Sequence, residues 1–267
     1  MVEFVEKIRA EATKEVDLIR KDNVFYLLLN KGKDFTFNDD NVRMIDQCLD
    51  TVQASEGAAA MITVVTSKRI CSSGFDMAFW RQKKGNVARS MASLQKLLAR
   101  LLVFPVITMM LCEGHLYAGG LIFALCHDYQ AMKANSGRLC LSEINIGLDL
   151  PPFYLAACKR TMGPQILREM LLGDPITTAD AKKRKLLSHV YKSNEQLEEI
   201  FDWFVKTKVP LGRKREILVD IKRQLHYEAI QTAQTVLYTP QNTLGIITID
   251  QPKPKRDEVK DPPRAKL

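Results

Sequence analysis

The 267-residue sequence has no apolar run of the roughly 20 residues that a membrane-spanning helix needs. Its six cysteines form no C-x-x-C pair and show no metal-ligand spacing, so we expect no metal site. Most of them lie in apolar runs, which predicts reduced core residues of an intracellular protein. The first 15 residues contain several glutamates, whereas a mitochondrial transit peptide is poor in acidic residues.

The bulk composition is that of a globular protein, with 46% hydrophobic and 26% charged residues. The net charge of +8 suits an anionic partner, and coenzyme A, RNA and an anionic membrane surface all fit. Basic residues gather at 182–185, at 213–215 and in the segment 253–266. Each of these runs is alternatively an ordinary solvated face.

Strand-like and helix-like patterns alternate along the chain, which predicts an α/β fold. We expect an amphipathic helical extension at residues 1–15, a core at 16–190, a helical region at 191–238 and a Pro/Lys-rich tail at 239–267. Within the core, the patterns predict a hairpin at 16–29, buried strands at 59–66 and 105–112, and helices at 38–53, 88–102 and 121–126. Further along, they predict helices at 195–206 and 213–236 and a short strand at 246–249.

The most informative segment begins at the Gly119-Gly120 pair and ends at Glu143. Two glycines let the backbone approach a ligand closely, and the buried helix after them directs its positive end toward that ligand. Such N–H groups stabilise a developing negative charge, for example on a thioester carbonyl that becomes an enolate. From the residues alone, close helix packing explains the glycines equally well, and Glu143 is a surface residue at a strand end.

Four motifs in order resemble those of the crotonase superfamily, the enoyl-CoA hydratases and isomerases. They are Ser72-Ser73-Gly74-Phe75-Asp76, the segment 113–120, Ser142-Glu143 with the following Ile-x-Ile-Gly-Leu, and the segment 163–190. The resemblance runs from about residue 16 to about residue 191. It is strongest to the Δ3,Δ2-enoyl-CoA isomerases of the plant-like peroxisomal kind.

The resemblance implies a spiral of ββα units followed by a C-terminal helical region. It assigns the acid/base role to Glu143 and the two oxyanion-hole N–H groups to Phe75 and Gly119. Apolar neighbours should raise the pKa of Glu143 toward the working pH. Hydratases of this family carry a second glutamate where this chain has Ile122, so a single carboxylate would shuttle the proton. The coenzyme A thioester is then the substrate, and no cofactor is expected.

The resemblance also suggests residues that bind the acyl-CoA. They are Ser73, Gly74, Asp76, Gly120, Ile122, Pro151 and Phe153, of which Pro151 and Phe153 would shape the acyl end of the pocket. Lys68 and Arg69 are candidates for the coenzyme A phosphates, with a solvated loop as the alternative, and Arg213, Lys214 and Arg223 are further candidates for the 3′-phosphate. We interpret His115, His127 and Asp128 as structural residues.

The last three residues, Ala265-Lys266-Leu267, differ by one small residue from the Ser-Lys-Leu signal read by the peroxisomal import receptor. We therefore expect a peroxisomal protein, with a mitochondrial location as the alternative. The family implies a homotrimer or hexamer. The net charge, the N-terminal extension and the Pro/Lys-rich tail leave open a structural or RNA-associated subunit of a larger assembly. A hydratase or an acyl-CoA hydrolase is a third reading, which Ile122 disfavours.

Overall fold

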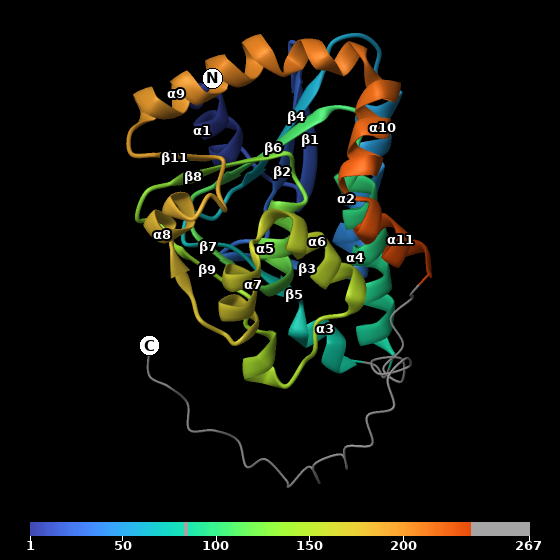
Figure 1. Ribbon diagram of the computed structural model, residues 1–267. Helices are drawn as coiled ribbons and strands as arrows, with labels where there is room; N and C mark the ends of the chain where they lie inside the picture. The colour runs from blue at the N-terminus through green and yellow to red at the C-terminus, as the bar shows by residue number, and fades with distance from the viewer. Residues whose placement is uncertain (83–84, 236–267) are drawn as a thin grey trace, which may run out of the picture.

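The computed structural model describes residues 1–82 and 85–235 (Figure 1). The predicted tail at 239–267, its strand at 246–249 and the residues 265–267 lie outside that part. No described helix is long and apolar enough to cross a membrane.

Two sheets are built by strands that alternate between them along the chain (Figure 1). The first contains β1 (Val16–Lys21), β2 (Val24–Leu29), β4 (Ala60–Val65), β6 (Ile107–Cys112), β8 (Tyr129–Lys133) and β11 (His189–Tyr191) in that order. The second has the order β10 (Ile176–Thr177), β9 (Arg138–Cys140), β7 (His115–Tyr117), β5 (Ile70–Phe75) and β3 (Asp34–Phe37). Only the β1–β2 and β9–β10 pairs are antiparallel among the described strands. Each successive pair of parallel strands therefore places one member in each sheet, which confirms the predicted spiral of ββα units.

The helices follow these strand pairs. In the core they are α2 (Asp39–Ala54), α3 (Met77–Gln82), α4 (Asn86–Leu102), α5 (Ala118–Leu125), the 3-10 helix η1 (Glu143–Ile146), α6 (Pro152–Thr161), α7 (Pro164–Leu171) and α8 (Thr178–Lys183). The extensions are α1 (Val2–Ala10), α9 (Asn194–Thr207), the 3-10 helix η2 (Val209–Arg213), α10 (Arg215–Leu225) and α11 (Tyr227–Thr235). Asn38 caps α2 through a reciprocal pair of hydrogen bonds with Asn41, as the Asn-Asp-Asp sequence suggests.

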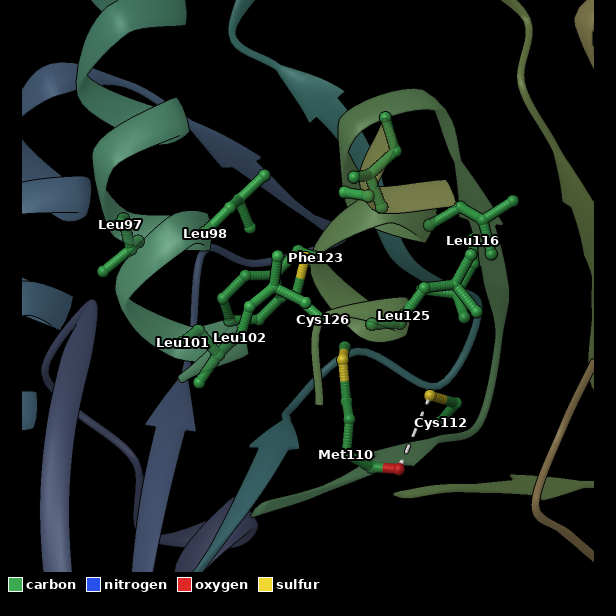
Figure 2. Close-up of a cluster of buried hydrophobic side chains, with 14 of the residues drawn as sticks. Leu97, Leu98, Leu101, Leu102, Met110, Cys112, Leu116, Phe123, Leu125 and Cys126 are labelled. Carbon is green, nitrogen blue, oxygen red and sulfur yellow. Dashed lines mark hydrogen bonds between the residues drawn. The ribbon is translucent and has the colours of Figure 1, made fainter. Parts of the chain in front are cut away.

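The first sheet is buried on both faces because successive side chains of a strand point to opposite sides. Phe25, Leu27 and Leu29 of β2 face the central core, whereas Val24, Tyr26 and Leu28 face an outer cluster. The outer cluster is covered by α1 and α9, and the central core by α2, α4, α5 and α6 (Figure 1). Figure 2 shows the central core between α4, α5 and β6, with the side chains of Leu98, Leu102, Met110, Phe123 and Cys126 converging.

Buried ionic contacts fasten the N-terminal helix and a C-terminal helix to the first sheet. In α1, Arg9 pairs with the buried Glu113 and donates to the carbonyl oxygen of Val65. In α10, the buried Lys222 donates to the carbonyl oxygens of Phe104 and Val106 and pairs with Asp128.

The two extensions depart from the predicted boundaries. The N-terminal helix ends at Ala10, so the predicted helical extension to residue 15 is too long. The single helix predicted at 213–236 is wrong as well. It is divided at His226 into α10 and α11, because α10 packs in the outer cluster and α11 packs in the central core.

Candidate active site

A mostly apolar cavity of about 240 Å³ lies where β5, α5 and η1 meet. It is lined by Ser73, Phe75, Met77, Trp80, Met91, Ala118, Gly119, Ile122, Ser142, Glu143, Ile146, Leu148, Leu150, Pro151 and Tyr154. They include residues from three of the four motifs that resemble those of the crotonase superfamily, and none from the fourth, the segment 163–190. The fold therefore brings together segments that are separated by about 70 residues in the chain.

The first wall is the end of β5. Gly74 has a φ of +94°, in the left-handed region that favours glycine. A Cβ atom at Gly74 would lie only 2.9 Å from the backbone nitrogen of Gly119. The end of β5 and the start of α5 are thus in direct backbone contact, which places Phe75 and Gly119 side by side at the cavity.

The second wall is the N-terminus of α5. Ala118, its first residue, has a φ of +49°, which is uncommon outside glycine. None of the described side chains caps this helix, and the N–H groups of a first helical turn have no partner within the helix. The helix dipole adds a partial positive charge at the same end. The wall at Gly119 is therefore suited to an anionic oxygen.

The third wall is η1, whose first residue is Glu143. The Oε2 atom of this half-buried residue is shielded from solvent and has no hydrogen-bond partner in the part of the chain that the structure describes. Burial raises the pKa of the Glu143 carboxyl above its ordinary value, while a hydrogen bond from its own backbone opposes the rise. Glu143 thus has a carboxyl group with an increased proton affinity and one oxygen that could bind a proton of a ligand.

Apolar side chains form the deep part of the cavity. Ile122 is 1% exposed, and Trp80, Met91 and Tyr154 are also buried. The Tyr154 hydroxyl donates to the carbonyl oxygen of Met91 at 2.7 Å, so its polar group is already satisfied. Toward the surface, Met77 and Ile146 are exposed. The cavity therefore accepts an apolar chain next to one carboxylate.

The structure does not bring every predicted residue to this cavity. Gly74 and Gly120 lie behind its walls, and Phe153 is buried in the core, with Tyr154 lining the cavity instead. Asp76 is absent from the cavity lining and caps α3 by accepting from the N–H of Phe79 at 3.0 Å.

The residues predicted to contact the coenzyme A phosphates lie outside this cavity, and their binding of the phosphates stays a prediction. Lys68 and Arg69 precede the first residue of β5, whereas the cavity lies at its last residue. Lys68 instead pairs with Glu6 of α1 at 2.7 Å. Arg213, Lys214 and Arg223 border other surface hollows.

The sequence reasoning missed several apolar lining residues, chiefly Met77, Trp80, Met91, Ile146 and Leu148. Met91 shares the helical spacing of the core residues of α4, so its pattern alone does not distinguish a core residue from a cavity residue. The ring of Trp80 packs on that of Phe75 with centroids 4.7 Å apart, a contact that only the structure shows.

The histidines of this region take part in local structure. His127 is bonded to Thr63 and to the carbonyl oxygen of Phe123, and burial lowers its pKa to about 4. His115 lies outside the cavity and is bonded to the Tyr117 hydroxyl. Among the described residues, no group of three histidine, cysteine or acidic side chains is arranged to hold a metal ion.

The known proteins that are similar to this chain agree with one another in the kind of protein they are. Residues 20–250 match the family described as enoyl-CoA hydratase/isomerase. The chain is 29% identical over 228 residues to the peroxisomal enoyl-CoA delta isomerase 2 of Arabidopsis thaliana, covering 79% of this chain and 92% of the relative. It is 31% identical over 160 residues to enoyl-CoA delta isomerase 3 of the same plant, covering 58% and 67%.

The fold is shared with a solved enoyl-CoA hydratase/isomerase family protein from Pseudomonas syringae. The TM-score is 0.73 at 18% identity, with 82% of this chain and 95% of that chain covered. Since the family match extends over most of the sequence and the spiral of ββα units agrees with it, the chain belongs to the enoyl-CoA hydratase/isomerase family.

Proposed function

We propose that this protein is an enoyl-CoA isomerase that converts a 3-enoyl-CoA into the 2-enoyl-CoA. The Glu143 carboxylate removes a proton from C2, and the electron pair is delocalised into a dienolate thioester. The N–H groups of Phe75 and Gly119 donate to the oxygen of that dienolate. Glu143 then returns the proton to C4, so substrate and product have the same composition and no cofactor is required.

One observation carries this proposal. Glu143 is the single carboxylate among the cavity-lining residues that the structure describes, and the apolar Ile122 lies on another wall of the same cavity. A hydratase must orient and deprotonate a water molecule, and an isoleucine side chain can do neither. A proton shuttle needs only one group that accepts and returns a proton, which the single carboxylate supplies.

The environment of Glu143 supports the same role. A carboxyl group of ordinary pKa is a weak base at neutral pH, and burial strengthens Glu143 as a base by raising its pKa. The names of the two Arabidopsis thaliana relatives, both delta isomerases, favour isomerisation over hydration.

The test is an assay of the purified protein with 3-hexenoyl-CoA, beside the Glu143→Gln variant. We expect turnover to 2-hexenoyl-CoA in the wild type and a loss of about 100- to 10,000-fold in the variant. Hydration of 2-hexenoyl-CoA by the wild type should be slow or absent. Full activity of Glu143→Gln would refute the assignment of the base.

A second candidate is a structural or RNA-associated subunit built on the same fold. It is favoured by the net charge of +8 and by α1, which precedes the family match that starts at residue 20. This reading predicts acyl-CoA binding without turnover and retention on RNA that weakens steeply with salt. The same purified protein distinguishes the two candidates.

Location and assembly complete the proposal. We propose a peroxisomal enzyme, because two delta isomerase relatives carry that location in their names. Imaging of an N-terminally tagged protein, with and without residues 265–267, tests it.

We also propose a homo-oligomer, supported by the exposed Ile217, Ile221 and Leu225 on α10. Analytical ultracentrifugation measures that state directly.

A further inference from the structure

The strand that carries Phe75 is irregular just before that residue. Against β3, the paired residues change from Asp34 with Ile70 to Thr36 with Gly74, so β5 has two more residues than its partner over this interval. The register against β7 shifts in the same interval. A bulge of this kind removes backbone groups from the regular ladder, so other contacts must fix the conformation of the strand.

Asp34 supplies those contacts from the edge strand β3. Its Oδ1 atom accepts the backbone N–H of Ser73 at 2.9 Å, and its Oδ2 atom accepts the Ser73 hydroxyl. The carboxylate therefore holds one residue at two points, in place of the missing ladder bonds. Ser73 is separated from Phe75 only by Gly74, whose left-handed φ makes the next peptide unit sensitive to where Ser73 is held.

The other side of Phe75 is fixed by the same part of the chain. The Asp76 N–H donates to the carbonyl oxygen of Phe37 at 2.8 Å, and the Lys31 ammonium donates to the Asp76 carboxylate at 2.9 Å. The segment 31–37 therefore anchors the residues before and after Phe75. On the upstream side, the described side chain that binds the Ser73 backbone is that of Asp34.

We infer that Asp34 is a positioning residue that orients the Phe75 N–H toward the substrate oxygen. The inference rests on the proposed function. Asp34 does not line the cavity, so it acts through Ser73 and not on the substrate. A reacting group displaced by 1 Å can lose about 100-fold in rate, so removal of the anchor should lower kcat more than it changes KM.

If the Asp34 charge acted directly on the oxyanion, its removal would raise kcat, whereas loss of a positioning residue lowers kcat. A negative charge near a developing oxyanion opposes its formation, so neutralising that charge would raise the rate. Asp34→Asn removes the charge but keeps an oxygen that accepts the Ser73 N–H. Asp34→Ala removes the charge and the accepting oxygen. The positioning role predicts near-normal kcat for Asp34→Asn and a reduced kcat for Asp34→Ala.

The experiment compares the wild type, Asp34→Asn and Asp34→Ala with the control Asp202→Ala, an exposed residue of α9. Two readouts are needed: kcat and KM with 3-hexenoyl-CoA, and the infrared C=O stretch of bound hexanoyl-CoA, which cannot isomerise. We expect Asp34→Ala to lower kcat by about 10- to 100-fold at similar KM and to move the C=O stretch toward its solution value. Asp34→Val replaces it if the alanine variant does not fold, because a β-branched side chain suits an edge strand and valine has no oxygen that could accept the Ser73 N–H.

The outcomes separate this inference from the proposed function. A wild-type protein that binds hexanoyl-CoA without a lowered C=O stretch refutes the oxyanion hole, and the inference with it. A wild-type shift that persists in Asp34→Ala, with kcat unchanged or with only a lower Tm, overturns the inference and leaves the proposed function intact.

Discussion

A methyl group at Gly120 would test how closely α5 must approach β5. A Cβ atom at this position lies 2.5 Å from both the Cβ and the Oγ of Ser72 and 2.6 Å from its carbonyl oxygen. Ordinary van der Waals contacts of a Cβ atom begin at 3.4 Å, so the shortfall is about 0.9 Å. The Ser72 hydroxyl is fixed by its bond to the carbonyl oxygen of Phe35, and the other clashing atoms belong to the strand itself. The helix must therefore retreat by nearly the whole shortfall.

We expect Gly120→Ala to lower stability and activity together. Overpacking of a buried contact costs about 1–3 kcal/mol, which corresponds to a decrease in Tm of about 5 °C for a chain of this size. The retreat of α5 carries the Gly119 N–H away from Phe75 by a comparable distance. A displacement of that size should lower kcat by about 100-fold. Thermal unfolding followed by circular dichroism and the isomerase assay measure the two effects.

Two other glycines provide matched controls. Gly163 precedes α7 with an ordinary φ, and no atom lies within 4 Å of the position that an added methyl group would take, so Gly163→Ala should keep the Tm and kcat of the wild type. At Gly119 the nearest atom is 3.5 Å away, so Gly119→Ala should fold normally although the residue lines the cavity. Wild-type Tm and kcat in Gly120→Ala would refute the reasoning.

Other buried or strained groups give further predictions. The pKa of Glu143 is raised in the folded state, so the folded protein loses stability as pH rises from 4.5, the ordinary pKa of this carboxyl, through the raised pKa. Glutamine carries no charge at any pH, so Glu143→Gln should have a higher Tm than the wild type at pH 8 but not at pH 4. The lower limb of kcat/KM against pH should lie above pH 4.5 for the same reason. Lys222→Met leaves Asp128 without its buried partner and should cost about 3 kcal/mol in urea unfolding. Ala118→Gly removes an unfavourable φ and should raise the unfolding free energy by about 0.5 kcal/mol, measured in the same way.

Much of the fold could be predicted because the core elements have strong patterns. The apolar strands β4 and β6 lie within two residues of the predicted ranges, and so does α4. The assignment of strands to two sheets came from the family resemblance, because periodicity does not say which strands pair. The division at His226 could not be predicted, since neither glycine nor proline marks it and the helical pattern continues. It arises because Leu218 and Ala229 are buried in different clusters.

In the candidate site, too, the residues of the motifs could be predicted from the sequence, but contacts that depend on the folded chain could not. Glu143, Ile122, Phe75 and Gly119 share one cavity as predicted from the motifs. Lys68 is close to the oxyanion motif in sequence, but six residues of strand, about 20 Å, separate it from the cavity. Its contact with the coenzyme A phosphates stays a prediction. Asp34 was not identified because its contact with Ser73 depends on a bulge that the sequence does not reveal.

The two proposed donors share a backbone feature. Each is preceded by a residue in the left-handed region, Gly74 before Phe75 and Ala118 before Gly119. The dihedral angles of a residue set the direction of the next N–H, so this conformation turns both groups away from the course of a regular strand or helix. At Ala118, which is not a glycine, the conformation is strained, and such strain persists only where surrounding contacts fix the backbone. Asp34 holds the strand before Gly74 through Ser73, and the close approach of Gly120 to Ser72 holds the start of α5 just after Ala118.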